Sequence, residues 1–298
     1  MANGYGNTTQ LITIPYLTLE EYKNAPTAID LDNLVFNSQD PEAQDAELRN
    51  VIGRASSWAD TYCNQVLGAT LETEQQRTRI TPSDGSIRLH PRFSPIVALT
   101  DFNYGYPTNM ANLGDCSNAW IEEQEIIIPN AQLGNWTSQG PLSFGSYNGG
   151  YQNEIFVRYT YVAGYTNTVV AVPSLVGDTQ IIVTNPTGIT AGQMLNIYDG
   201  LNTELVTVAN NYVFGNATVP LAAPMLYAHD IDTSVSALPP AIKEAVILIT
   251  TAFLKVRGDS SMSMSVSTLP SVAVPGSEKY GDELATASRL LSSYRRIR

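Results

Sequence analysis

Apolar residues follow two different spacings along this chain, and the change from one to the other divides it into regions. Residues 238–258 contain a nearly continuous apolar segment with two prolines at its start and Gly258 at its end. Proline suits the first turn of a helix and glycine the position after the last turn, so this segment predicts one helix. Apolar side chains on almost every side are typical of a helix inside a bundle. Its uncharged run, 245–254, is shorter than the about 20 residues that span a bilayer, so we expect no membrane segment.

Two amphipathic segments can supply partner helices for this apolar helix. The first covers 41–67 with Asp40 as its N-cap, and its apolar residues recur every three or four positions: Leu48, Val51, Ile52, Ala55, Trp58, Ala59, Tyr62 and Val66. The second begins at Ser277, ends near Arg296 and has a similar stripe: Tyr280, Leu284, Ala287, Leu290, Leu291 and Tyr294. We interpret Trp58 and Tyr62 as core residues rather than a ligand-stacking pair, because both belong to the apolar stripe. Cys63 is predicted to be a small buried hydrophobe.

Elsewhere apolar residues recur at about every second position, which is typical of strands. A capping box of Thr18 and Glu21 predicts one short helix before this β-rich region. The predicted strands and turns are a hairpin of 77–80 and 86–89 around the turn 83–85, strands 96–104, 125–129 and 154–161, and a second β unit with strands 180–184, 194–198 and 204–208.

These elements predict an α+β fold. We expect a helical bundle built from N- and C-terminal helices, a β-hairpin and sheet excursion, and an inserted small β-sandwich or barrel domain. The predicted segments are an N-terminal arm with a short helix at 1–37, a core helix plus β excursion at 38–167, the inserted β domain at 168–237, and C-terminal helices completing the bundle at 238–298.

The charge of the chain limits its partners. A net charge of −12 argues against a general grip on nucleic acid, which needs clustered Lys and Arg. Acidity also serves solubility, and it would suit a wall past which DNA must slide. The N-terminus has neither a basic start nor an apolar core, so we expect synthesis in the cytoplasm rather than secretion.

Residues for catalysis or metal binding do not form a recognisable set. His90 and His229 are far apart in the sequence, and neither has a cysteine or carboxylate at ligand spacing. Glu122, Glu123 and Glu125 are interpreted as a solvated strand edge rather than as catalytic carboxylates. We therefore expect no catalytic residue, no cofactor and no metal site, and no enzyme activity.

The C-terminal end is basic on an otherwise acidic chain. It carries Arg289, Arg295, Arg296 and Arg298 beside Tyr294. Cations near the end of a helix complement the helix dipole, which accounts for one or two of them. The alternative is that these five residues bind an acidic or polar partner surface.

Three stretches together resemble the head-to-tail connector (adaptor) proteins of tailed bacteriophages. The stretches are the helix 46–63 leading into the segment 87–96, the sequence Leu-Pro-Pro-Ala-Ile-Lys-Glu-Ala at 238–245, and the ending Ala-Ser-Arg-Leu-Leu-Ser-Ser-Tyr-Arg-Arg at 287–296. The segments 178–208 and 226–229 resemble a β module inserted in some phage virion proteins; the shorter adaptors lack it.

The resemblance implies a structural virion protein at the neck, where head and tail meet. It implies a homo-oligomeric ring, commonly of about twelve copies, bound beneath the portal protein, continuing the channel for genomic DNA and docking a neck or tail-completion protein. DNA would pass without sequence-specific binding. Under this interpretation the five C-terminal residues contact the portal or a neighbouring subunit. The alternative function is a tail or capsid-decorating module that recognises glycan or a host surface through 168–237.

Overall fold

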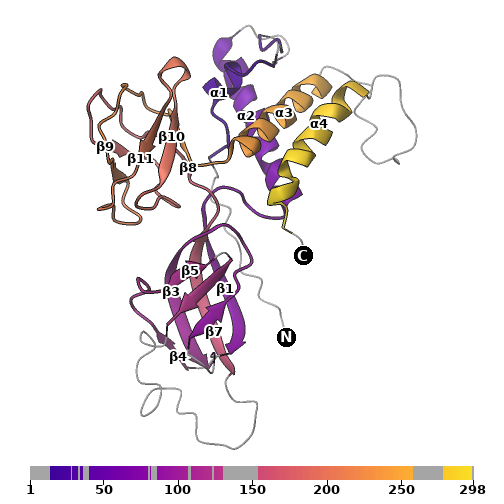
Figure 1. The fold of residues 1–298 in the computed structure, drawn as a ribbon. Helices are drawn as coiled ribbons and strands as arrows, with labels where there is room; N and C mark the ends of the chain where they lie inside the picture. Colours follow the sequence, from indigo (N-terminus) through magenta and orange to yellow (C-terminus); the bar gives the residue numbers. More distant parts are fainter. Residues whose placement is uncertain are drawn as a thin grey trace, which may run out of the picture. The chain divides into compact units, whose positions relative to one another are not determined.

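The computed structural model describes residues 14–27, 29–32, 34–35, 40–79, 81, 86–106, 109–122, 124–129, 154–257 and 278–296. Within them it is a mixed α+β protein with four α-helices and four antiparallel sheets, so the predicted α+β class is confirmed (Figure 1). The chain divides into two compact units. Unit 1 contains Ala69–Gly164, and unit 2 contains Ile12–Gly68 and Tyr165–Arg298. The four segments predicted from the sequence stay a prediction.

The helices of unit 2 begin where the sequence provides caps. They are α1 Leu19–Lys23, α2 Pro41–Cys63, α3 Pro240–Arg257 and α4 Glu278–Leu291, the last followed by a 3₁₀ turn, Ser292–Tyr294. Thr18 and Glu21 form the predicted capping box at α1, and Asp40 caps α2. The first amphipathic helix ends at Cys63 rather than near residue 67, because Asn64 adopts a left-handed conformation with φ 54°. α4 ends at Leu291, before the predicted end near Arg296.

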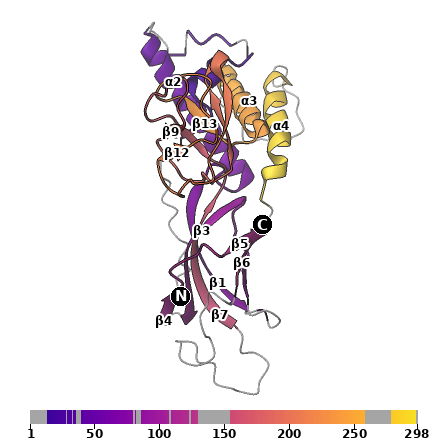
Figure 2. The same cartoon turned by 60° about the vertical axis from the view of Figure 1, so that its left-hand side comes forward.

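All four helices contribute to one hydrophobic core, and α3 and α4 lie side by side in both views (Figures 1 and 2). Val51 of α2 and Ile249 of α3 are buried in this core, and Leu290 of α4 packs against it. Cys63 is buried there as predicted, and burial raises the pKa of its thiol to about 12. Residues from both halves of the sequence therefore stabilise the same helical part.

The described residues of unit 1 form two antiparallel sheets. One has the order β1-β7-β3-β4, with β1 Thr70–Arg79, β7 Glu154–Ala163, β3 Ile96–Tyr106 and β4 Asn109–Asn112; its long strands run beside one another in Figure 2. The other has the order β2-β6-β5, with β2 Ile87–Leu89, β6 Glu125–Ile128 and β5 Trp120–Glu122. Buried side chains of both sheets share one core, including Ile87, Phe102, Ile126 and Val157.

The predicted hairpin of 77–80 and 86–89 is found only in part: the N–H of Thr81 donates to the carbonyl of Ser86 at 2.9 Å, but the described strands on the two sides pair with other strands. β1 pairs with β7 from Thr70 to Arg79, and β2 pairs with β6, so the two strands belong to different sheets. β1 also starts seven residues earlier than predicted, since pairing with β7 extends a polar stretch that has no apolar alternation. Ile80 and the predicted turn 83–85 lie outside the described residues.

Residues 165–237 of unit 2, called here the small β domain, have a core of their own. The strands are β8 Asn167–Val169, β9 Gln180–Ile182, β10 Met194–Tyr198, β11 Glu204–Thr207, β12 Thr218–Pro220 and β13 Ser234–Ser236. They form the sheets β11-β10-β13-β8 and β12-β9. Ile181 of the smaller sheet and Leu195, Ile197 and Val235 of the larger one are buried in a common cluster. β8, β12 and β13 were not predicted from the sequence; each is short and gains its strand structure by pairing with another segment of the domain.

Candidate functional site

The C-terminal segment is attached to the end of α2 by hydrogen bonds to and from its backbone. The N–H of Arg296 donates to the carbonyl of Cys63 at 2.9 Å. The side chain of Gln65 donates to the carbonyl of Tyr294 at 3.0 Å, and that of Asn64 to the carbonyl of Arg296 at 3.4 Å. Residues 294–296 therefore have a fixed path across the end of α2.

The predicted partner-binding residues differ in their exposure and in the contacts that their side chains make within the chain. Tyr294 is half-buried and makes an edge-on ring contact with Tyr165, with 6.2 Å between centroids. The guanidinium of Arg295 lies 5.4 Å from the ring centroid of Tyr62, and its side chain is exposed. Arg289 is exposed on α4, and Arg296 is half-buried.

The structure therefore brings Tyr294, Arg295 and Arg296 to the end of α2 and leaves Arg289 on the outer side of α4. Arg298 lies outside the described residues. These residues are visible as a group in the sequence, but nothing in the sequence indicates the orientation of any one of them. The contact between Arg295 and Tyr62 joins residues far apart in the chain, and no local pattern indicates it.

Trp58 and Tyr62 are more than core residues. Their rings stack with centroids 5.4 Å apart, and both side chains pack on the helical core while remaining partly exposed. The stack is the platform on which Arg295 lies. The interpretation of this pair as core residues is thus correct in part: the pair also orients a cation of the predicted partner-binding segment.

The turn after α2 depends on a buried carboxyl group. The Tyr16 hydroxyl donates to Asp60 at 2.5 Å and accepts hydrogen bonds from the N–H groups of Leu67 and Gly68 at 3.0 and 2.9 Å. Burial raises the pKa of Asp60 to about 6, although its hydrogen bonds with Tyr16 and Leu67 act in the opposite direction. This network fixes the chain where it leaves α2.

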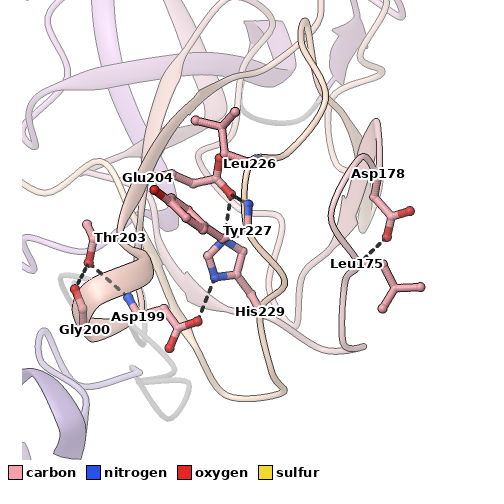
Figure 3. Close-up of polar contacts among 9 residues, drawn as sticks. All are labelled: Leu175, Asp178, Asp199, Gly200, Thr203, Glu204, Leu226, Tyr227 and His229. Atoms are coloured by element: carbon pink, nitrogen blue, oxygen red, sulfur yellow. Dashed lines mark hydrogen bonds and ion pairs between the residues drawn. The ribbon is translucent and has the colours of Figure 1, made fainter.

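A second polar cluster, in the small β domain, surrounds a buried histidine (Figure 3). His229 is 1% exposed; its Nδ1 lies 3.0 Å from Asp199 and its Nε2 lies 2.8 Å from Glu204. Glu204 also accepts from the N–H groups of Leu226 and Tyr227. Asp199 and Glu204 are distant from His229 in the sequence and meet it only through the fold, so no spacing in the sequence indicates this cluster.

This cluster is arranged for structure rather than for chemistry on a substrate. Both ring nitrogens of His229 already face carboxylates, so neither is available to activate a nucleophile. Ser174 pairs with His229 through the backbone, and no hydrogen bond joins its hydroxyl to the imidazole. Within the described residues, no group of His, Cys, Asp or Glu has an arrangement that could hold a metal ion. His229 instead joins the 226–229 segment to the β10–β11 turn.

The small β domain has an unusual surface. Its 73 residues include five Asp or Glu and no Lys or Arg. The described residues contain 14 exposed large hydrophobic side chains, and 11 of them lie here: Val172, Leu175, Val176, Met194, Leu201, Leu205, Val213, Phe214, Leu226, Tyr227 and Ile231. Exposed apolar side chains in this number make the domain a candidate for contact with a partner.

Comparison with protein-family models, with curated proteins and with solved structures finds no match for this chain. Across the part of the chain that the structure describes, no helix is both long and apolar enough to cross a bilayer.

Proposed function

We propose that this chain is a head-to-tail connector protein of a tailed bacteriophage. In this proposal, copies of the chain form a ring, commonly of about twelve, beneath the portal protein in the neck of the virion, after synthesis in the host cytoplasm. The ring extends the DNA channel and docks a neck or tail-completion protein. The proposal rests on the resemblance of three stretches to connector proteins and on the physical features below.

The observation that carries the proposal is the shared core of helices from distant parts of the chain. α2 lies before unit 1 in the sequence, whereas α3 and α4 follow the small β domain, yet all three contribute to the same hydrophobic cluster. We propose that these helices form the helical bundle of a connector. In the same view, residues 168–237 are an inserted small β-sandwich or barrel, supported by the core that its two sheets share.

A ring requires complementary surfaces on each copy. The proposed partner-binding residues are Arg289, Tyr294, Arg295, Arg296 and Arg298, which contact the portal or a neighbouring subunit. The contact with Tyr62 supports this role for Arg295, because it holds an exposed cation in one orientation before a partner arrives. The apolar surface of the small β domain offers a second contact area.

Charge is compatible with DNA passing through such a ring. The chain has a net charge of −12. Phosphates and an acidic wall repel each other, so DNA is not held along the channel and no sequence-specific contact is needed. The proposal includes no enzyme activity and no cofactor.

Imaging tests the ring directly. Negative-stain electron microscopy and native mass spectrometry of the purified chain, alone and mixed with the portal protein from the same phage, should show closed rings in at least one sample. Failure to form a ring in both samples, or labelled copies at the virion periphery rather than the neck, argues against the proposal.

The C-terminal contact has its own test. We expect the double substitution Arg289→Glu and Arg295→Glu to lower retention by immobilised portal at least tenfold, because each reversal replaces attraction with repulsion. Truncation after Leu291 is a less specific test, since it also removes the bonds from Arg296 to Cys63 and from Gln65 to Tyr294. Arg49→Glu, on the exposed side of α2, is the matched control. Equal retention of both variants would exclude this role for Arg289 and Arg295.

A second candidate function is a binding module that recognises glycan or a host surface through 168–237. The observation in its favour is that exposed aromatic rings, Phe214 and Tyr227, lie on a domain without Lys or Arg. Aromatic rings can pack on the apolar faces of sugars. A glycan array probed with the whole chain and with Tyr227→Ala separates this function from the connector: specific glycan binding lost in the variant supports it, and no binding excludes it.

A further inference from the structure

A hollow in unit 1 has three arginines in its lining. Its volume is about 360 Å³, and it is lined by Arg77, Thr78, Arg79, Thr81, Arg88 and His90. This hollow plays no part in the connector proposal, and its chemistry differs from that of the acidic chain around it.

Two strands from different sheets meet to build the hollow. Arg77 and Arg79 are two residues apart on β1, so they share one face of that strand. Arg88 is the exposed central residue of β2. The hydroxyl of Thr78 donates to the carbonyl of Arg88 at 3.0 Å, which ties β1 to β2. The arginines thus converge because the backbone fixes the two strands against each other.

The described residues that line the hollow include three arginines and no carboxylate. Glu125 lies 3.5 Å from the guanidinium of Arg88 and 3.4 Å from the imidazole of His90. A guanidinium offers five N–H donors, so this one long contact leaves donors of Arg88 for an anion.

We propose that this hollow binds a phosphate-type oxyanion. Guanidinium groups match phosphate through paired N–H donors, and the hydroxyls of Thr78 and Thr81 can add single hydrogen bonds. The volume lies in the lower part of the range for small-molecule sites, about 300–1,000 Å³, so it has room for more than one phosphate group. The phosphate can belong to a nucleic-acid strand or to a free oligophosphate, and the experiment separates these two sources.

The experiment is calorimetric titration of the whole chain with pyrophosphate and, separately, with a short oligothymidylate, at about 50 and about 200 mM salt. We expect Arg77→Gln combined with Arg88→Gln to weaken binding at least about tenfold, because each change removes charge-assisted hydrogen bonds. Arg158→Gln is the matched control: it is an exposed arginine on the neighbouring strand β7 and does not line the hollow. The control should stay within about twofold of the unmodified chain.

The outcomes show whether the hollow binds phosphate and whether that phosphate belongs to a nucleic-acid strand or to a free oligophosphate. Oligothymidylate binding that is salt-sensitive and lost in the double variant identifies a strand, whereas pyrophosphate binding lost in that variant identifies a free oligophosphate. Absence of binding by both ligands overturns the proposal, as does binding unchanged in the double variant. If circular dichroism shows the double variant to be unfolded, the single variants and Arg77→Lys, which keeps the charge but loses the paired donors, are titrated instead.

Discussion

The helical part of unit 2 and the small β domain differ in surface chemistry: the first carries ion pairs, whereas the second exposes apolar side chains. Ion pairs join the helices at the edges of their core, between Lys23 and Asp45 at 2.6 Å and between Lys255 and Glu283. The small β domain has no lysine or arginine with which to form such pairs, and it exposes 11 large hydrophobic side chains. Both parts nevertheless enclose a core of fully buried aliphatic residues.

This difference separates residues that hold the fold from residues that are available for contact. A surface rich in charge keeps a protein apart from others, whereas an apolar surface without cations favours association. Under the proposed function, the helical part stabilises the molecule and the small β domain offers its surface to a partner. The following predictions test that separation.

Truncation of a buried residue in the helical part should have the largest effect. Ile249 of α3 is 0% exposed in the core that all four helices share. Ile249→Ala removes buried methyl groups and leaves a cavity, so we expect the free energy of unfolding to fall by about 3–4 kcal/mol. Urea unfolding followed by Trp58 fluorescence, with Trp120 and Trp136 replaced by Phe, measures this effect.

The matched control loses an aliphatic side chain from the small β domain. Leu201 is 102% exposed, so Leu201→Ala should change the free energy of unfolding of that domain by less than about 0.5 kcal/mol. Hydrogen exchange of the strands β10 and β11 reports on it. Similar losses for the two variants would remove the proposed distinction.

The buried histidine should have the second-largest effect, this time inside the small β domain. His229→Ala leaves Glu204, whose side chain is 5% exposed, without one of its partners. We expect a loss of about 2–3 kcal/mol in that domain, because a buried carboxylate would lose a strong hydrogen bond. Hydrogen exchange at peptides spanning 194–208 and 225–236 should become about 30-fold to 150-fold faster.

His90→Ala is the control for this measurement. His90 has an exposed side chain paired with Glu125 in unit 1, so exchange in the small β domain should not change. His229→Gln, which keeps one donor, should recover part of the protection. An unaltered exchange rate in His229→Ala would show that the domain does not depend on this cluster.

The helices were the most predictable part of the fold because their signals are local. Asp40 and Thr18 cap the helices that follow them, and the spacing of Leu48, Val51 and Ile52 identifies the buried face of α2. Most of β1 was not predicted from the sequence. It gains its strand structure by pairing with β7, which lies far away in the sequence.

The candidate sites were less predictable for the same reason. The basic C-terminal residues are visible in the sequence, whereas the position of Arg295 over Tyr62 is not. Asp199 and Glu204 flank His229 only after β10 and β11 turn the chain back. The arginines of the hollow in unit 1 come from strands of two sheets, and the sequence predicted those strands to be one hairpin.

A pH-dependent effect of intermediate size should come from Asp60 in the helical part. Its pKa is raised to about 6 in the folded chain, so the folded state holds this proton more tightly than the unfolded state, where the pKa is close to 3.9. The stabilisation is complete below pH 4 and is lost as the pH rises through about 6. We expect a contribution of about 2 kcal/mol, since partial exposure reduces it.

Comparison with Asp60→Asn isolates this contribution from the other carboxyl groups. Asparagine keeps an oxygen that can accept from Tyr16 and Leu67 but does not titrate. Between pH 4.5 and pH 7, by urea unfolding, the unmodified chain should lose about 1.3 kcal/mol of this contribution relative to the variant. A parallel pH dependence of the two proteins would contradict the role assigned to Asp60.

The smallest effect on stability, and the most informative one for function, is expected from the apolar surface of the small β domain. Leu205 and Leu226 are 64% and 69% exposed, so Leu205→Ser with Leu226→Ser should change the free energy of unfolding by less than about 0.5 kcal/mol for each residue.

If this surface meets a partner or another copy, the same pair of changes should lower ring formation, measured by native mass spectrometry with portal present. Arg49→Ser in the helical part is the control, and it should leave ring formation unchanged. A double variant that assembles as well as the unmodified chain would show that these exposed leucines are not contact residues, and the contrast between the two surfaces would then lose its functional meaning.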